Sequence, residues 1–112
     1  MKQVILDTSF ILSCVKQKID FFHWLNSEGI KVLIPEQTLK ELRGLGKELA
    51  LKIIDKNKFE EIKISGKDAD AAIVNYAKKN PEAIVATLDK DLQNKTKNKK
   101  LIIRGKKRLE II

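Results

Sequence analysis

The sequence predicts an α/β protein, a three-layer α/β/α sandwich around a central parallel sheet of five strands. Strand and helix signals alternate along the chain, which is the order that builds a doubly wound parallel sheet. The strand segments are short, apolar and rich in β-branched residues, as strands buried on both faces are. A length of 112 residues suits one domain, and we expect no linker, repeat or second domain within 1–112.

The first half of the chain predicts two buried strands and the helices that follow them. The strands are VILDT at 4–8 and KVLI at 31–34, and apolar residues at helical spacing fill the region 11–25 between them. Pro35 suits the first turn of the next helix. That helix breaks at two nearby glycines and resumes over 49–54.

The second half continues the alternation. FEEIKI at 59–64 alternates in polarity and predicts a strand at the edge of the sheet. Ser65 is expected to begin a helix that runs to about Lys79, and AIVAT at 83–87 is the strongest signal for a buried strand. The remaining elements expected are a polar helix at 90–98, a strand at 101–103 and a further short strand in the closing RLEII.

Composition narrows the class of protein. Hydrophobic residues make up 43% and charged residues 34%, which is typical of a soluble globular chain. No apolar run is long enough to span a bilayer, and the first residues lack the features of a secretory signal. The single cysteine, Cys14, excludes an internal disulfide and a cysteine-based zinc site. We therefore expect a cytoplasmic protein.

Positive charge is concentrated near the end of the chain. The segment 90–108 holds nine basic residues against the single acid Asp91, so it carries all of the net charge of +8. Charge alone favours a polyanionic partner and a solvated lysine-rich surface equally.

Four carboxylates stand at unusual places. Asp7 ends the first strand and Asp89 follows the 83–87 strand, so both belong to the carboxyl edge of the sheet, where ligands of such folds gather. Asp70 heads an apolar helical stripe, and Glu41 lies in the first turns after a strand. A carboxylate at the end of a buried strand is costly unless its charge is compensated.

Structural explanations exist for several of these acids. Asp89 suits the N-cap of the helix that follows it. Asp68 fits a capping pattern with Ser65, and Asp91 gains from the dipole of its helix. Glu41 on its own would be a solvated helix residue.

Taken together, the acids indicate a metal site. Two of the carboxylates about 4 Å apart repel by roughly 4 kcal/mol at an effective dielectric constant of 20. Convergence of Asp7, Glu41, Asp70 and Asp89 would therefore require protons or divalent cations. Oxygen ligands favour Mg²⁺ or Mn²⁺. An acidic metal-binding edge beside a basic segment suits phosphodiester cleavage.

Four segments resemble the PIN domain family of metal-dependent ribonucleases. They are DTSF at 7–10, IPEQTLKEL at 34–42, DADAAIV at 68–74 and VATLDKDL at 85–92. The closing IIRGKKRLE is similar to the archaeal and eukaryotic branch related to small-subunit ribosomal RNA processing factors, whereas VapC-type toxins share the acids but usually end differently.

The resemblance implies roles for these residues. Asp7, Glu41, Asp70 and Asp89 would be catalytic. Asp7, Asp70 and Asp89 would hold one or two Mg²⁺ or Mn²⁺ ions, with Glu41 as a further ligand or a base that orients water. Secondary positions are Thr8, Ser9, Asp68, Thr87 and Asp91. RNA would be bound by Lys95, Lys97, Lys99, Lys100, Arg104, Lys106, Lys107 and Arg108.

Two departures concern positions beside these acids. Close relatives often carry Asn at the position of Leu88 and a second Asp at the position of Ala71, and both substitutions bear on rate and metal preference. A haloacid-dehalogenase-like phosphatase is disfavoured because Ser9 stands where its motif needs a second aspartate.

The function expected is a metal-dependent endoribonuclease, with ribosomal RNA processing as one setting. A ribosomal-RNA-binding assembly factor that hydrolyses little, and a toxin whose cleft is covered by an antitoxin, remain alternatives. A homodimer is also left open, with Phe21 or Trp24 as contact residues if they are exposed.

Overall fold

Residues 2–112, the part of the chain that this computed structural model describes, alternate between strands and helices in the order expected. The elements are β1 (Gln3–Leu6), α1 (Thr8–Gln17), α2 (Phe21–Ser27), β2 (Lys31–Pro35), α3 (Glu36–Gly44), α4 (Glu48–Asp55), β3 (Glu60–Ile62), α5 (Ala69–Lys79), β4 (Ile84–Ala86), α6 (Lys90–Lys95), β5 (Lys100–Arg104) and β6 (Arg108–Ile111). The strands form one sheet in the order β3-β2-β1-β4-β5-β6.

The sheet confirms the predicted fold class and adds one strand to it. β1 to β5 are parallel, and β6 pairs antiparallel with β5, with Leu101 opposite Ile111 and Arg104 opposite Arg108. Only three residues, 105–107, connect the two strands, and a parallel crossover needs a dozen or more. The closing RLEII is therefore a sixth strand, in the one direction that this connection permits.

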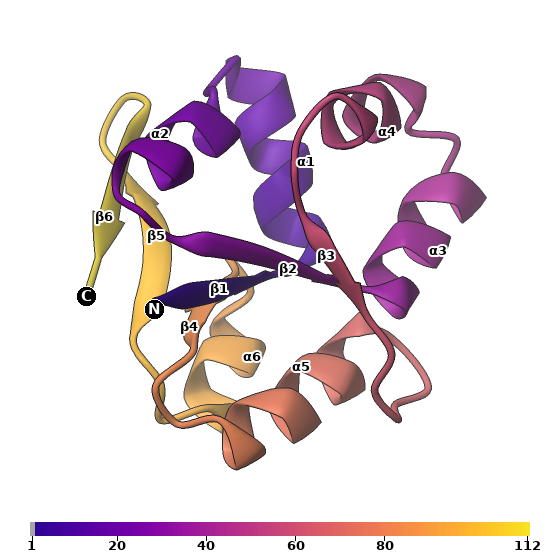
Figure 1. Cartoon of the computed structure of the whole chain (residues 1–112), viewed down its shortest axis with the longest axis vertical. Helices are drawn as coiled ribbons and strands as arrows, with labels where there is room; N and C mark the ends of the chain where they lie inside the picture. The colour runs from indigo at the N-terminus through magenta and orange to yellow at the C-terminus, as the bar shows by residue number, and fades with distance from the viewer. Residues whose placement is uncertain (1) are drawn as a thin grey trace.

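Alternate strand residues face two different hydrophobic clusters. Val4 and Leu6 of β1 belong to the first cluster, which also takes buried side chains from α1, α2, α3 and α4. Ile5 faces the second cluster, together with Ile73 of α5 and Leu92 of α6. Strands that are apolar on both faces thus give the three-layer sandwich visible in Figure 1, with α5 and α6 on one side of the sheet.

Helix boundaries in the first half follow from local backbone geometry. The helical region expected over 11–25 is two helices, because Lys18 adopts a left-handed conformation (φ 59°) that ends α1. The carboxylate of Asp20 then accepts a hydrogen bond from the amide of His23 and caps α2. Phe21 is 1% exposed and packs edge-to-face on Phe10, so it is a core residue and not a dimer contact.

The start of α5 differs from the prediction. Ser65 does not cap the helix, because α5 begins only at Ala69, and the Ser65 carbonyl instead accepts a hydrogen bond from the side chain of Asn75. Asp68 is the N-cap instead, and its carboxylate accepts a 2.9 Å hydrogen bond from the amide of Ala71. Both residue types are good caps, so composition alone does not choose between them.

The end of α6 is also earlier than expected. The helix stops at Lys95 because Thr96 is extended, and the buried side chain of Asn98 donates hydrogen bonds to the carbonyls of Asn80 and Ala83. These bonds hold the connection to β5 against the end of α5. Among residues 2–112, no helix is long and apolar enough to cross a membrane.

Candidate functional site

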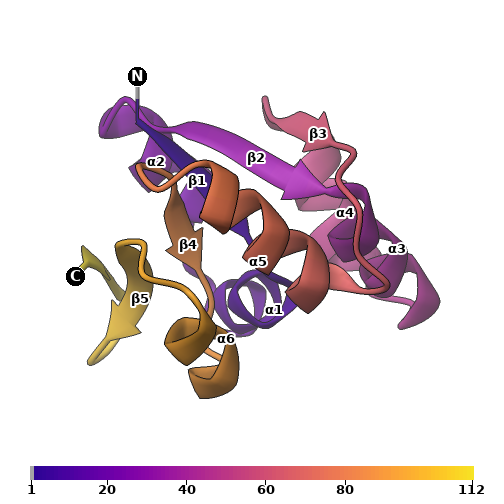
Figure 2. The ribbon, with the colours of Figure 1, turned by 90° about the horizontal axis from the view of Figure 1, so that it is seen from below.

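The carboxyl ends of β1 and β4 form the point where the strand order reverses. From β1 the chain proceeds to β2 on one side, and β4 lies on the other side of β1. Asp7 and Thr87 are the residues that directly follow these two strands. Ligands of open α/β sheets bind at such a switch point, so this edge is the candidate site. In Figure 2 the arrowheads of β4 and β5 both point toward this edge, in the lower part of the view.

Asp7 is a buried carboxylate held by two hydroxyl groups. It is 4% exposed, and its Oδ2 accepts hydrogen bonds of 2.8 Å from Ser9 and 2.8 Å from Thr87. Asp7 occupies the N-cap position of α1, but its side chain makes no capping hydrogen bond. The carboxylate is therefore oriented by the site and not by the helix that it precedes.

Thr87 connects the two loops that meet here. Besides donating to Asp7, its hydroxyl accepts a 3.0 Å hydrogen bond from the amide of Asp89. The Ser9 hydroxyl lies 3.3 Å from the Thr87 hydroxyl, and the Thr87 carbonyl accepts a 2.8 Å hydrogen bond from the side chain of Gln93. The loop after β4 is thus fixed relative to the carboxylate that follows β1.

Asp89 caps α6, as its structural explanation predicted. Its Oδ1 accepts hydrogen bonds of 2.9 Å from the amide of Asp91 and 3.3 Å from the amide of Leu92. Asp91 lies exposed in the first turn of α6 and forms a long ion pair of 3.9 Å with Lys95. Within residues 2–112 no hydrogen bond is found at Oδ2 of Asp89, which leaves this oxygen for a further ligand.

Glu41 joins three helices. Its Oε1 accepts a 2.7 Å hydrogen bond from the hydroxyl of Thr8 in α1, and its Oε2 accepts a 2.9 Å hydrogen bond from the amide of Ala69 in α5. Glu41 is therefore not a solvated helix residue, which was the structural alternative to a role in the site. Its charge sits at the N-terminus of α5, where the helix dipole favours it.

Asp70 lies half-buried in the first turn of α5. Burial raises the pKa of its carboxyl above the ordinary value, and the negative charges of Asp7, Asp89 and Asp68 raise it further, while Lys95 opposes them. Asp70 thus shares one electrostatic environment with the residues that follow β1 and β4. Desolvation and like charges together are typical of functional carboxylates.

The donor set suits a hard divalent cation, but the side chains are not spaced as a closed metal site. Within residues 2–112, no group of three or more His, Cys, Asp or Glu side chains is close enough to hold a metal ion. Both hydrogen bonds found at the Asp7 carboxylate go to Oδ2, which leaves Oδ1 for another partner. Mg²⁺ is commonly held by one or two carboxylates with water filling the remaining positions. The residues present fit that mode of binding.

The basic residues expected to bind RNA are not equivalent. Lys100 is half-buried, and its ammonium donates hydrogen bonds to the carbonyls of Thr96 and Asn98, so its charge is used within the fold. Burial also lowers the pKa of Lys100. Arg104 forms a 2.9 Å ion pair with Glu110. Arg104 is exposed nevertheless, and so are the remaining members of the set, Lys95, Lys97, Lys99, Lys106, Lys107 and Arg108.

Gln37 is a residue near the site that the sequence analysis missed. Its side-chain amide donates hydrogen bonds of 2.7 Å to the carbonyl of Ile64 and 2.9 Å to the carbonyl of Gly66. Its buried Oε1 finds no partner among residues 2–112. These bonds hold the loop between β3 and α5, and so help to fix the position of the first turn of α5, where Asp70 lies. A single glutamine in an amphipathic helix carries no sequence signal for such a role.

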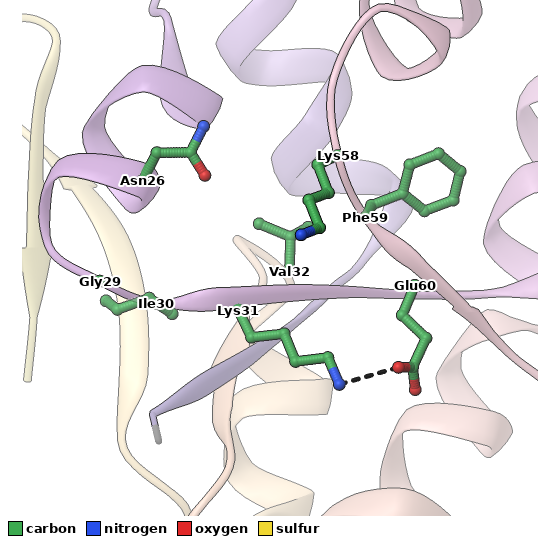
Figure 3. Close-up of a pocket in the computed structure, with 8 residues that line it drawn as sticks. All are labelled: Asn26, Gly29, Ile30, Lys31, Val32, Lys58, Phe59 and Glu60. Carbon is green, nitrogen blue, oxygen red and sulfur yellow. Dashed lines mark ion pairs between the residues drawn. The ribbon is translucent and has the colours of Figure 1, made fainter.

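The pocket in Figure 3 lies at the opposite edge of the sheet. It has a volume of about 630 Å³ and is lined by residues at the amino ends of β2 and β3, including Val32 and Phe59. A 2.8 Å ion pair between Lys31 and Glu60 closes one side of it. The pocket therefore has no contact with the carboxylates. A smaller pocket of about 450 Å³ is lined by Glu41 and Asp68.

Comparison with known proteins identifies relatives that cover most of the chain. Residues 4–107 match the family described as a PIN-like domain. Ribonuclease VapC4 of Methanocaldococcus jannaschii is 31% identical over 99% of this chain and 97% of its own length. The rRNA-processing protein fcf1 of Schizosaccharomyces pombe is 35% identical over 82% of this chain, which spans about half (52%) of that relative.

A solved structure shares the fold. It is described as the structure of the PIN domain endonuclease Utp24, and it superposes with a TM-score of 0.84 and 28% sequence identity over 97% of this chain and 90% of its own. The resemblance noted in the sequence is thereby confirmed. The chain belongs to the PIN-like domain family.

Proposed function

We propose that this protein is an endoribonuclease that depends on Mg²⁺ or Mn²⁺ and uses the carboxylates at the carboxyl edge of β1 and β4. Membership of the PIN-like family supports the proposal, as do the names of its relatives, which include a ribonuclease and an endonuclease. The observation that carries it is the buried Asp7 carboxylate, which Ser9 and Thr87 hold at the switch point of the sheet through Oδ2, leaving Oδ1 for another partner. The pKa of Asp70 is raised by burial and by the charges of Asp7 and Asp89, so this edge holds excess negative charge that a divalent cation would neutralise.

Each carboxylate has a distinct part in this proposal. Asp7 and Asp70 would hold the cation, with Asp89 binding it directly or through water. Ser9 and Thr87 would keep the Asp7 carboxylate in place through the two hydrogen bonds to Oδ2. A bound Mg²⁺ or Mn²⁺ would supply Lewis acidity at the phosphodiester and a lower pKa for the attacking water.

Glu41 has a separate role. Both of its oxygens are engaged, by Thr8 and by the amide of Ala69, so it would align α5 and thereby Asp70. Through an outer lone pair it would also accept a hydrogen bond from the attacking water. Asp68, which caps α5, and Asp91, in the first turn of α6, would add negative charge at the rim.

The substrate proposed is RNA, with ribosomal RNA as the first candidate. The similarity to the rRNA-processing protein fcf1 supports that choice. A toxin ribonuclease regulated by an antitoxin is the second candidate, favoured by the near full-length match to VapC4. The gene neighbour separates them, because a small DNA-binding partner indicates a toxin and ribosomal or translation genes indicate processing.

The test is cleavage of a labelled single-stranded RNA with Mn²⁺, with Mg²⁺ and with a chelator. Asp7→Asn should lower the rate at least roughly 100-fold, since even outer-shell changes at metal sites cost 10- to 100-fold. Asp55→Asn is the matched control, because this exposed acid ends α4, away from the carboxyl edge, and its loss should leave the rate unchanged. Equal rates for Asp7→Asn and the wild type would reject the proposal. RNA binding with no metal-stimulated cleavage would favour the rRNA-binding factor instead.

A further inference from the structure

The basic residues of the segment 90–108 divide between opposite edges of the sheet. β5 runs parallel to β4 from Lys100 to Arg104, so Arg104 and the turn after it lie at the carboxyl edge, where Asp7 lies. Lys97 and Lys99 precede β5 and lie at the amino edge. A strand of this length separates the two groups by about 15 Å. One segment of sequence therefore presents two separate positive surfaces.

The group at the carboxyl edge is the basic hairpin, Arg104–Arg108. All five of its residues are exposed, and four of them carry a positive charge. Arg104 stands directly opposite Arg108 in the β5–β6 register, and like charges at paired positions are unfavourable. Glu110 pairs with Arg104, whereas within residues 2–112 no ion pair is found for the other cations of the hairpin.

Lys107 adds a conformational observation at the tip of the hairpin. Its φ is 60°, a left-handed backbone conformation that glycine or asparagine adopts far more readily. Gly105 in the same turn also has a positive φ of 59°. A lysine held where glycine would be less strained points to a role for its side chain.

We propose that the basic hairpin holds the phosphates of the RNA strand beside the scissile bond, and that Lys97 and Lys99 take no part. This inference rests on the proposed function for the identity of the substrate. β5 lies two strands from β1 in the order β1-β4-β5, so the hairpin is about 10 Å to the side of the Asp7 strand. An extended strand of a few nucleotides spans that distance.

The chemistry of the hairpin favours a nucleic acid backbone over a protein partner. Residues 104–108 offer exposed cations and no apolar side chain. Protein interfaces depend on buried aromatic, aliphatic or arginine anchors in desolvated pockets. Phosphate contacts need only exposed positive charge, as non-specific binding to single strands does.

Two matched double variants test the inference. Lys106→Gln with Lys107→Gly removes two charges at the hairpin, and glycine suits the backbone at 107. Lys97→Gln with Lys99→Gln removes two charges at the amino edge, from residues that are also exposed. Binding to a fluorescent 12-nucleotide oligouridine is measured against salt concentration, in chelator and without metal, so that no cleavage is needed. Thermal melting confirms that both variants fold.

The hairpin variant should flatten the salt slope by about 1.4, because each phosphate contact on a single strand contributes roughly 0.7. That change corresponds to about 25-fold weaker binding at 0.1 M salt if the curves converge at 1 M. The amino-edge variant should keep the slope and affinity of the wild type. Equal losses in the two variants, or none in either, would overturn the inference.

Two further measurements distinguish RNA binding by the hairpin from binding of acidic peptides, and distinguish the role of the hairpin from the nuclease function. The first is binding of an oligoglutamate of equal length. If it binds the wild type as tightly as oligouridine does, and its affinity falls as much in the hairpin variant, the hairpin recognises acidic peptides as well as RNA and the inference fails. The second is cleavage of RNA by the wild type. If the two variants differ in RNA affinity as expected but the wild type cleaves no RNA, the role of the hairpin in binding is supported and the nuclease function is rejected. If the wild type cleaves RNA but the two variants bind it equally well, the role of the hairpin is rejected and the nuclease function stands.

Discussion

The hydroxyl of Thr87 donates a 2.8 Å hydrogen bond to Oδ2 of Asp7, and so joins loops that lie 80 residues apart in the chain. Both side chains are almost fully buried, and the same hydroxyl accepts a hydrogen bond from the amide of Asp89. One side chain therefore orients the carboxylate that follows β1 and the backbone that precedes α6.

Replacing Thr87 with valine should destabilise the protein and slow cleavage. Valine keeps the shape but removes a donor to a buried charge, which costs about 1.5–3 kcal/mol in free energy of unfolding. Urea unfolding measures the stability, and the Mn²⁺-dependent assay measures the rate. Thr87→Ser is the control, since it keeps the hydroxyl and loses one methyl group. Equal losses of activity in the two variants would contradict this role.

Replacing Asp70 with asparagine should stabilise the protein at neutral pH while abolishing cleavage. The raised pKa of Asp70 means that the folded protein holds this proton more tightly than the unfolded chain does. Stability therefore falls as the pH rises above the ordinary value of 3.8 toward the pKa of the folded state. At neutral pH the ionised carboxylate is unfavourable, and asparagine removes that cost.

The gain should be less than about 1 kcal/mol, because solvent that still reaches Asp70 screens the repulsion. It should disappear below about pH 3.8, where the wild-type carboxyl is protonated in both states. Urea unfolding at neutral and acidic pH measures the difference, with Asp55→Asn as a control that shows no such trend. A loss of stability at neutral pH would show that Asp70 makes a favourable contact.

Replacing Gly66 with alanine should displace the loop before α5. A Cβ at Gly66 would lie 2.4 Å from the backbone nitrogen of Ala72, closer than packing allows, and the contact is with backbone that cannot turn aside. Overpacking of this kind costs roughly 1–3 kcal/mol in stability. Because this loop leads into Asp68 and Asp70, RNA cleavage should fall as well.

Gly44→Ala provides the contrast for that substitution. Gly44 ends α3, and a Cβ there meets nothing within 4 Å, so alanine should leave stability unchanged or raise it by about 0.5–1 kcal/mol. Thermal unfolding compares the two variants. Equal melting temperatures for Gly66→Ala and the wild type would show that the loop can shift at no cost.

The fold class and the edge of the sheet that holds the candidate site can be predicted from the sequence, because both depend on recognising the strands. Apolar, β-branched runs such as 83–87 identify parallel strands, and parallel strands bring the residues that follow them to one edge. This rule predicts that Asp7 and Asp89 lie at the same edge, and the structure places both there. The resemblance to the PIN family added the order of the acids.

The remaining features depend on tertiary contacts that a pattern does not encode. The ammonium of Lys100 donates hydrogen bonds to the carbonyls of Thr96 and Asn98, and these carbonyls come together only in the folded chain. The choice of Asp68 over Ser65 as the cap of α5 depends on the loop held by Gln37, a contact across 27 and 29 residues. The split of the basic segment follows from the direction of β5, which charge counting does not reveal.

The central claim is that Asp7 and Asp70 together hold a divalent cation at the carboxyl edge of β1 and β4. A crystal of the protein soaked in Mn²⁺ tests it most directly, through the anomalous signal of manganese. The account predicts a peak at ligating distance from Asp7 Oδ1 and from Asp70, and its loss in Asp7→Asn crystals. No peak at saturating Mn²⁺, or a peak only at other carboxylates, would contradict it.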